Sequence, residues 1–585
     1  MLWFTMPFGF AANQTDNTVV INEILASNHS GALDPDFSQF ADWIELYNNS
    51  AADIDLSGWT LTDDFSEPEK WHIPENIILP AHGYLLIWAD GTGLGLHSNF
   101  KLDNAGEVVG LYAPDGTAMD TLSFGEQVSD VSFGRSPVDL NVLLYFENPT
   151  PDGENSTEGV ETSLQSAQVE INKPSGFYTG AIDVTLSTVN GTIRYTTDGS
   201  TPNRFSPEYH TPLKISSTTV LKTGSFAPNL LPGPVETRTL FINEDVHLPV
   251  FSLTTEPDFL WDPDIGIYVD ENISARKSWE RPATLEFFDA NGYLAFSRQA
   301  DIRLFGRTAI YIPQKSLSIF LRDRLNYPLF PDMELHEFDA FLLRSSSDDW
   351  HQTMFRDGFI QKWVQDHMNV DTQAYRPAVL FINGAYWGIH NIREKYNESY
   401  VETHDGVDRD NVDILYIDER NEDVEVVAGD RAHYDALIDF ISTHDVSLEE
   451  NYDVVASLVD IDNLIDYVIA QAHIGNRSWA HNIRAWRPRT TDGKWRWMIF
   501  DLDRGFRYAS YNSLEEMANR FHPFSELLTN DIFKNRFIGR FVEYMNDSFS
   551  PARVVPLLDS LRSVIAPEMP NHIQRWDGFC GNNVC

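Results

Sequence analysis

The N-terminal part of the chain alternates short apolar runs with turn residues. Trp43–Tyr47, Tyr84–Trp88 and Val108–Tyr112 are strand-like, and Asn, Asp, Gly or Pro separates such runs. Short runs without helical periodicity are typical of antiparallel β-sandwiches. The pattern predicts one all-β domain over residues 19–146 and a second over residues 166–243.

Residues 147–165, between these two patterns, are rich in Pro, Gly, Ser, Thr and Glu. Almost nothing in this segment is apolar, so it cannot bury enough surface to pack. The composition therefore predicts a linker.

The start of the chain has a different character. Met1–Ala12 is apolar and ends in small residues, which resembles the core and cleavage end of a secretory signal, although a basic first part is absent. Residues 1–18 are therefore interpreted as a signal-peptide remnant. No later run approaches the roughly 20 apolar residues of a membrane span, so no transmembrane segment is expected.

The segment of residues 248–585 begins with strand-like apolar runs, and in its later part the apolar residues recur with the periodicity of helices. Arg376–Glu394 is predicted to be a hairpin, because Asn383-Gly384 between apolar arms is a strong turn signal. One helix face is predicted from apolar residues at the spacing i, i+3, i+4, i+7, i+8: Ile461, Leu464, Ile465, Val468 and Ile469. The third domain is therefore expected to be α+β.

A second predicted hairpin, Ile483–Phe500, delivers polar side chains to one end of a sheet. Its turn is Thr490–Gly493, with Asn482 before the first arm and Asp501 and Asp503 after the second. Hard divalent cations prefer such oxygen ligands, so these three residues are candidate ligands for Mg²⁺ or Mn²⁺. An isolated Asp-X-Asp would be better explained as an acidic hairpin end. Protein kinases order an Asn, a hairpin and a metal-binding Asp in the same way, which favours a metal–phosphate site.

Charge and cysteine content exclude some classes of function. The chain has 42 basic and 87 acidic residues and a formal net charge of −45. Such a surface repels phosphate backbones, so nucleic-acid binding is not expected, whereas a salty exterior or a basic partner suits it. The two cysteines, Cys580 and Cys585, provide no disulfide framework.

Several motifs carry a resemblance to known families. HNIRAWRP, GKWRWMIFDLDRGF and FINGAYWGI resemble the CotH family of spore-coat protein kinases. INEILASN, DWIELYNNS and DLSGWTLTD resemble a lamin-tail domain, and IRYTTDGSTPNRFSPEYHTPLKIS resembles the C-terminal β-sandwich of chitobiases and hexosaminidases. The expected fold is therefore multidomain, with two N-terminal all-β immunoglobulin-like sandwiches followed by an α+β atypical kinase-like domain.

The resemblance also bears on a candidate nucleotide site. The backbone of a Gly306-Arg307 turn can approach phosphates, and Lys315, which enters the next strand, can supply charge to them. Alone, a Gly-Arg turn followed by a Lys is a weak signal, because a solvent-exposed Lys on a strand gives the same pattern. The family pattern favours the functional interpretation of Lys315. The family's usual Ser-Arg is absent here, which leaves the Arg307 contact open. The resemblance further implies Glu394 near the nucleotide, paired with Lys315; an ion pair at the rim is the alternative.

The expected catalytic loop lacks an acid. CotH-like sequences carry Asn-X-Asp where this chain has Asn476-Arg477-Ser478, so the carboxylate that would accept the proton of the substrate hydroxyl is replaced by Ser478. Three alternatives stay open: Asp503 takes this role, His481 takes it, or the domain binds nucleotide without turnover.

Two classes of function follow. The first is a secreted or surface protein kinase that uses ATP with Mg²⁺ or Mn²⁺ to phosphorylate Ser or Thr of a coat or surface protein. The acidic net charge of the chain favours a basic protein substrate. The second is a non-catalytic surface or coat scaffold whose sandwiches bind a wall or matrix glycan. The set Asn482, Asp501 and Asp503 favours the kinase, whereas Ser478 and the accessory sandwiches favour the scaffold.

Overall fold

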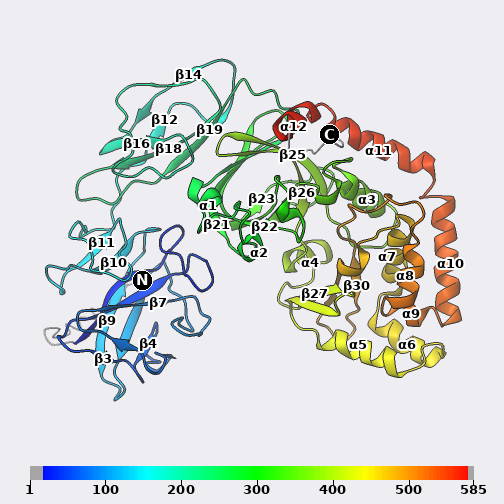
Figure 1. Cartoon of the computed structure of the whole chain (residues 1–585), viewed down its shortest axis with the longest axis horizontal. Coiled ribbons are helices and arrows are strands. Elements are labelled where there is room, and N and C mark those ends of the chain that lie inside the picture. The colour runs from blue at the N-terminus through cyan, green and yellow to red at the C-terminus, as the bar shows by residue number, and fades with distance from the viewer. Residues whose placement is uncertain (1–17, 578–585) are drawn as a thin grey trace, which may run out of the picture.

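The computed structural model describes residues 18–577 of the 585-residue chain. Figure 1 shows two β-rich parts, coloured blue to green-cyan, followed by a larger part in green to red that mixes sheet and helices. All but the last position of the interpreted signal-peptide remnant, and both cysteines, lie outside the described residues. No helix among residues 18–577 is long and apolar enough to cross a membrane.

The first domain consists of two antiparallel sheets around one apolar core, as the short alternating runs predicted. The sheets have the strand orders β11-β10-β1-β2-β7 and β5-β4-β8-β9, and β3 pairs with β6. Ile21, Ile87, Trp59 and Leu111 are buried together in this core. The strands are β1 (Val19–Leu25), β2 (Trp43–Asn48), β3 (Ile54–Asp55), β4 (Thr60–Thr62), β5 (Trp71–His72), β6 (Ile78–Leu79), β7 (Tyr84–Trp88), β8 (Glu107–Tyr112), β9 (Ala118–Phe124), β10 (Ser132–Arg135) and β11 (Leu143–Phe146).

The segment predicted as a linker, residues 147–165, packs against this domain for most of its length. The buried carboxylates of Glu23 and Glu45 accept hydrogen bonds from its backbone N–H groups at 3.1 and 2.5 Å. Asn155 is buried and donates to the carbonyl oxygen of Arg135 at 2.7 Å. Polar donors therefore hold the predicted linker to buried acids, without the apolar burial that the composition argument requires for packing.

The second domain is a smaller β-structure that packs on the third. Its four-stranded sheet has the order β13-β19-β18-β16, with the pairs β12-β15 and β14-β17 beside it. Thr239 and Ser252 share a buried hydrogen bond of 2.7 Å, and Phe241 packs edge-on against Phe288 across the same boundary. The strands are β12 (Glu170–Ile171), β13 (Gly176–Tyr178), β14 (Ile182–Val184), β15 (Leu186–Ser187), β16 (Thr192–Thr196), β17 (Leu213–Ile215), β18 (Thr219–Phe226) and β19 (Glu236–Ile242).

A closed seven-stranded barrel begins the third domain. Its strand order is β20-β21-β22-β23-β24-β26-β25, closed by the parallel pair of β20 and β25. The predicted Arg376–Glu394 hairpin is confirmed as β25 and β26, with Asn383 and Gly384 at φ values of 47° and 80° in its turn. The strands are β20 (Val250–Thr254), β21 (Arg281–Phe288), β22 (Leu294–Phe305), β23 (Ser316–Asn326), β24 (Glu337–Arg344), β25 (Tyr375–Ile382) and β26 (Ala385–Glu394). Short helical segments lie between them: α1 (Pro257–Trp261), α2 (Ile273–Arg276), η1 (Ala309–Tyr311), η2 (Ser347–Asp349) and α3 (Arg356–Gln365).

A four-stranded sheet and most of the helices complete the third domain. The sheet has the order β28-β27-β29-β30, and the predicted second hairpin is confirmed by the pairing of Ala485 with Trp497. Helix α7 buries the predicted apolar face, with Asp460 as its N-cap and Asp462 in its first turn. The elements are α4 (Glu398–Asp405), β27 (Val412–Asp418), β28 (Asp423–Ala428), α5 (Ala432–Thr443), α6 (Glu449–Leu458), α7 (Ile461–His473), η3 (Trp479–His481), β29 (Ile483–Pro488), β30 (Arg496–Met498), α8 (Ser513–Arg520), α9 (Phe524–Leu527), α10 (Asp531–Asn546), α11 (Pro551–Ile565) and α12 (Met569–Trp576).

Candidate functional site

A cleft of about 730 Å³ lies between the barrel and the helical half of the third domain. From the barrel side it is lined by the turn after β22, by Ser316 and Ser318 of β23, and by Arg344 at the end of β24. The helical half contributes the end of β27 and parts of the loops on either side of the β29–β30 hairpin. The hairpin therefore delivers its polar ends to a cavity, as its sequence predicted.

Asn482 and Asp501 are adjacent at the wall of this cleft. Asn482 Nδ2 donates to Asp501 Oδ2 at 2.9 Å and to the carbonyl oxygen of Ser478 at 3.2 Å. The amide nitrogen is thereby fixed, so the amide oxygen is the atom of Asn482 left for a further ligand. The backbone of Asp501 has a left-handed φ of 55°, so the chain leaves the extended strand conformation by this residue. This pair keeps the oxygen ligands that the sequence predicted for a divalent cation.

Asp503 lies beneath the cleft wall and does not line the cavity. Its side chain is 4% exposed, and Arg344 Nη2 lies 3.1 Å from Asp503 Oδ2 and 2.8 Å from Asp501 Oδ1. The Asp503 prediction as metal ligand and base therefore needs correction, because a buried guanidinium occupies the space between the two carboxylates.

Burial and neighbouring charges shift the pKa values of Asp357 and Asp503 in opposite directions. Two buried arginines, Arg344 and Arg393, contact the carboxylate of Asp357 at 3.3 and 2.5 Å. Burial opposes ionisation of Asp357, but these cations lower its pKa below the usual range. Burial raises the pKa of Asp503 well above its usual range, and Arg344 offsets this only in part. Burial therefore disfavours the ionised form of Asp503, although the guanidinium of Arg344 is in contact with it.

Ser478 and His481 both line the cleft. The hydroxyl of Ser478 lies 3.1 Å from Oδ1 of Asn476, which also accepts from the Ser478 backbone N–H at 3.0 Å. His481 Nδ1 is buried and has no hydrogen-bond partner among the described residues. Burial, with a contribution from Arg420, lowers the pKa of His481. The imidazole is therefore neutral near pH 7, the form that can accept a proton.

Lys315 and Glu394 do not line the cleft and do not pair with each other. Lys315 Nζ lies 3.0 Å from Asp270 Oδ1 and donates to the carbonyl oxygen of Ile310 at 2.8 Å. Glu394 is buried and contacts Nε2 of His404 at 2.7 Å. The predicted Lys315–Glu394 pair is wrong, because side chains alternate along β23 and the cleft receives Ser316 and Ser318.

The Gly306-Arg307 turn does line the cleft, as expected for a backbone that approaches phosphates. Gly306 has a φ of 102°, and a Cβ atom there would lie 2.9 Å from the Cβ atom of Ala309, so the turn requires glycine. Arg307 Nη1 lies 3.3 Å from Asp418 Oδ2 at the end of β27. This exposed ion pair joins the two sides of the cleft and is worth at most about 1 kcal/mol, so it opens readily.

Three parts of the chain match known protein families. Residues 302–583 match the family described as CotH kinase protein, residues 12–126 match the Lamin Tail Domain, and residues 173–235 match the Chitobiase/beta-hexosaminidase C-terminal domain. The chain carries a CotH kinase domain. The three matches follow the order that the sequence motifs predicted.

Other comparisons add little. No curated protein matches the chain. The solved structure of surface layer protein SbsC, domains 4-9, aligns at 10% identity over 49% of this chain and 39% of its own, with a TM-score of 0.12. The BSP domain of a biofilm associated protein aligns at 11% identity over 53% of this chain and 65% of its own, with a TM-score of 0.10. The chain thus covers less than two thirds of either structure.

The CotH domain places an excess of cations at its cleft, which the sequence motifs did not indicate. Six of the seven basic side chains that line the cleft were not predicted as site residues, although Arg344 ends a recognisable strand and Arg504 follows Asp503 directly. The basic residues that line the cleft are Lys277, Arg303, Arg307, Arg344, Lys395, Arg484 and Arg504. The acidic ones are Asp348, Asp418, Asp423, Glu425 and Asp501.

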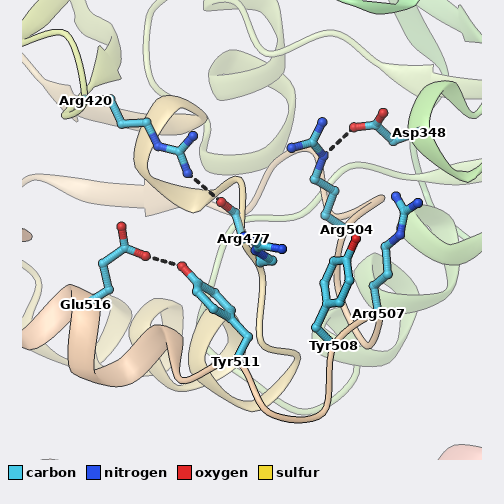
Figure 2. Close-up of a pocket in the computed structure, with 8 residues that line it drawn as sticks. All are labelled: Asp348, Arg420, Arg477, Arg504, Arg507, Tyr508, Tyr511 and Glu516. Atoms are coloured by element: carbon cyan, nitrogen blue, oxygen red, sulfur yellow. Dashed lines mark hydrogen bonds and ion pairs between the residues drawn. The ribbon is translucent and has the colours of Figure 1, made fainter.

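A second pocket of about 520 Å³ in the CotH domain adjoins the cleft and shares Asp348 and Arg504 with it. Figure 2 shows four arginine side chains around this pocket. The guanidinium of Arg477 lies 4.8 Å from the ring centre of Tyr508 and 5.3 Å from that of Tyr511. Among the described residues, no carboxylate pairs with three of these arginines: Arg420, Arg477 and Arg507.

Proposed function

We propose that the CotH domain is an atypical kinase that transfers the γ-phosphoryl group of ATP to Ser or Thr of a coat or surface protein. The observation that carries this proposal is the local charge of the cleft. Acidic residues outnumber basic ones 87 to 42 in the chain, yet seven basic and five acidic side chains line the cleft. A positive cavity in an acidic protein favours a polyanion such as a nucleoside triphosphate.

The residues at the hairpin ends fit a divalent cation only in part. Asp501 and the amide oxygen of Asn482 are the available oxygen ligands, while Asp503 is shielded by Arg344. Mg²⁺ and Mn²⁺ commonly bind through one or two carboxylates together with substrate phosphates and water. Asn482 and Asp501 would therefore hold the ion jointly with ATP, and the ion would offset charge on the phosphates.

His481 is the residue best suited to accept the proton. In the proposed step the hydroxyl oxygen of a substrate Ser or Thr forms a bond to the γ-phosphorus. The bond from that phosphorus to the bridging oxygen breaks, ADP keeps the electron pair, and the hydroxyl proton passes to the imidazole of His481. His481 lines the cleft and burial lowers its pKa, whereas Asp503 does not line the cleft and burial raises its pKa.

The arginine pocket supports an acidic or phosphorylated substrate segment. It lies beside the cleft, and Arg477 directly precedes Ser478 in the loop. The overall charge of −45 would instead attract a basic substrate over longer distances. At contact distance the nearby arginines dominate, because charge–charge energy falls with separation and salt screens the remote charges.

The alternative proposal is a non-catalytic surface or coat scaffold. Ser478 stands where the family has a carboxylate, and Lys315 and Glu394 both bind groups outside the cleft. A binding role for the two N-terminal domains toward a wall or matrix glycan belongs to this proposal, as does an extracellular location.

One experiment separates the two proposals. The full chain is incubated with labelled ATP, Mg²⁺ or Mn²⁺, and either an acidic or a basic Ser-rich peptide. We expect labelled peptide with the parent protein and none with Asp501→Asn. Asp492→Asn, an exposed acid in the hairpin turn, is the matched control and should retain activity. Equal label in the parent, in Asp501→Asn and without protein would leave only the scaffold proposal.

A further inference from the structure

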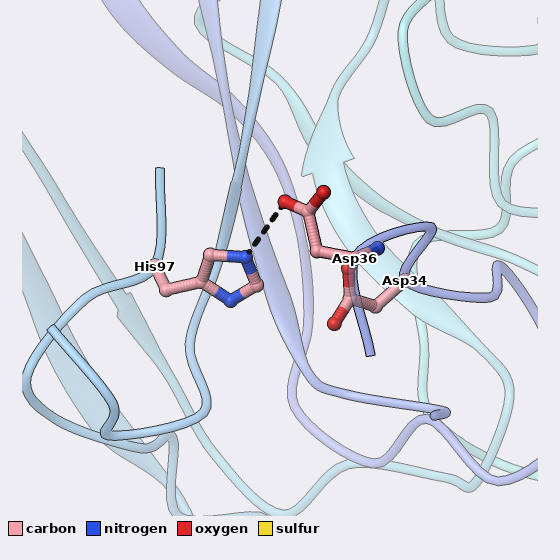
Figure 3. Close-up of side chains that lie close together, drawn as sticks. All are labelled: Asp34, Asp36 and His97. Carbon is pink, nitrogen blue, oxygen red and sulfur yellow. Dashed lines mark hydrogen bonds and ion pairs between the residues drawn. The ribbon is translucent and has the colours of Figure 1, made fainter. Parts of the chain in front are cut away.

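Three side chains of the first domain converge far from the CotH cleft. One ligand atom each from Asp34, Asp36 and His97 lies within 4.8 Å of the others. Figure 3 shows both carboxylates facing the imidazole ring. Asp34 and Asp36 come from the loop between β1 and β2, and His97 comes from the loop after β7. Acidic clusters occur without ions, so the convergence alone decides nothing.

The second observation is a buried carboxylate oxygen without a partner. Asp34 is fully buried, and its Oδ2 atom accepts no hydrogen bond from any described residue. Its other oxygen accepts from the backbone N–H of Asp36 at 2.9 Å. A buried, unpaired carboxylate oxygen is costly, so a positive ligand at this point would compensate for the lost solvation.

The histidine is held in the orientation that metal ligands commonly have. His97 Nδ1 lies 2.9 Å from Asp90 Oδ2, and Nε2 faces Asp36 Oδ2 at 3.3 Å. Asp90 is itself fixed, because its Oδ1 accepts from the backbone N–H and the hydroxyl of Thr92, both at 2.9 Å. A carboxylate that binds one ring nitrogen while the other faces the ligand is the usual arrangement behind a metal-bound histidine.

We propose that Asp34, Asp36 and His97 form a binding site for a first-row divalent metal, with Zn²⁺ as the probe. A nitrogen with two carboxylate oxygens is a ligand set for Zn²⁺, whereas Ca²⁺ and Mg²⁺ prefer oxygen alone. The side chain of Asp36 is 72% exposed, which gives the site access to solvent and leaves room for water as a fourth ligand.

The loop that carries both aspartates also touches the third domain. The carbonyl oxygen of Ser38 accepts from Arg281 Nη1 at 3.1 Å, and Phe40 packs at 5.3 Å, centre to centre, against Phe259 of α1. A metal that joins Asp34 to His97 would fix this loop. The site therefore stabilises the contact between the first domain and the barrel.

The test measures metal content and melting temperature of the full chain. We expect about one Zn²⁺ per chain after dialysis of the parent, and a large loss of bound metal in Asp36→Asn and His97→Ala. Asp90→Asn should weaken Zn²⁺ binding by about 10–100-fold, the usual effect of removing the group behind a metal-bound histidine. With free Zn²⁺ at a hundred times Kd, the first melting step should rise by roughly 5–10 °C.

Two controls and one variant at an exposed position make the result decisive. His72→Ala removes an exposed histidine of the same domain and should bind Zn²⁺ as the parent does. Asp501→Asn should also retain this metal, which separates the site from the CotH cleft. Asp36→Asn alters an exposed side chain, so it tests the site even if His97→Ala fails to fold.

Two outcomes would overturn the proposal. Equal Zn²⁺ content in the parent, Asp36→Asn and His97→Ala would mean that the ion binds elsewhere on the acidic surface. A parent that retains no Zn²⁺ and melts at the same temperature with and without it, or one that Ca²⁺ alone stabilises, would show that His97 serves only in an ion pair with the aspartates.

Discussion

Asn482 Nδ2 donates a 2.9 Å hydrogen bond to Asp501 Oδ2 at the wall of the CotH cleft. This bond fixes the amide so that its oxygen and the carboxylate can act together on one ion. If they do, ATP should stabilise the protein against heat only when Mg²⁺ or Mn²⁺ is present. The gain is about 2.7 kcal/mol at a ligand concentration a hundred times Kd, which a melting scan resolves.

Asp501→Asn should remove most of this gain and change the melting temperature without ligands much less. Asp492→Asn is the control, since this acid is exposed in the turn of the same hairpin. An ATP shift of equal size with and without the metal would contradict the assignment of Asn482 and Asp501.

The protonated state of Asp503 is the second prediction. Because burial raises the pKa of Asp503 well above its usual range, Asp503→Asn should change the free energy of unfolding by less than about 1 kcal/mol at pH 7. Arg344→Met should cost about 3–5 kcal/mol, because it leaves the buried carboxylate of Asp357 without one of its two cations and Asp501 without its ion-pair partner. Urea unfolding of the full chain measures both values. A cost for Asp503→Asn as large as that for Arg344→Met would show that Asp503 is ionised.

The third prediction concerns the proton acceptor. His481→Gln should lower the rate of phosphate transfer by roughly 10²–10⁴-fold with little change in ATP affinity, if His481 is the general base. Ser478→Asp restores the carboxylate of related sequences and should raise the rate of the parent. Single-turnover rates and ATP binding are measured side by side. Unchanged transfer in His481→Gln together with complete loss in Asp503→Asn would return the role to Asp503.

The arginine pocket provides the fourth prediction. Arg477→Gln should weaken the binding of a Ser peptide with neighbouring acidic or phosphorylated residues by about tenfold, or 1.4 kcal/mol. Fluorescence anisotropy measures this without any phosphate transfer, so the result does not depend on kinase activity. The matched control is Arg562→Gln on α11, far along the chain and exposed. Tighter binding of a Lys-rich peptide than of the acidic one would contradict the proposed substrate class.

The fifth prediction is a loss of stability in mild acid. His572 of α12 accepts a hydrogen bond from the backbone N–H of Ile389 at 3.1 Å. Burial lowers the pKa of His572 to about 3, and His390 adds to this effect. The folded state therefore binds a proton less well than the unfolded state, whose histidine titrates near pH 6.5. The stability contribution is complete above pH 6.5 and is lost as pH falls toward 3, by about 2 kcal/mol between pH 6.5 and pH 5.

Melting temperatures at pH 7 and pH 5 check this sign. His572→Asn keeps an acceptor for Ile389 but cannot be protonated in this range, so it should lose less stability on acidification. His351→Asn changes an exposed histidine and should behave as the parent does. Equal acid sensitivity of the parent and His572→Asn would show that α12 is held in another way.

Short-range features of the chain were predictable from its sequence. The two hairpins formed as expected because their turns and alternating arms involve residues close along the chain. Asn482 and Asp501 lie next to each other because the hairpin returns the chain to the end of the sheet at which it entered. The apolar face of α7 followed from helical spacing alone. The three family matches rest on motifs that are likewise local.

The tertiary structure decided the features that depend on distant residues and on burial. Alternation along β23 gave two faces, but only the closed barrel decided that Ser316 and Ser318, not Lys315, line the cleft. Arg344 lies 157 positions before Asp501 and contacts both Asp501 and Asp503, so a residue remote in the sequence sets the charge around these carboxylates. Side-chain charge and burial depend on neighbours that local patterns do not specify. For this reason the sequence determined the elements and their polar ends, and the fold determined which of those groups form a site.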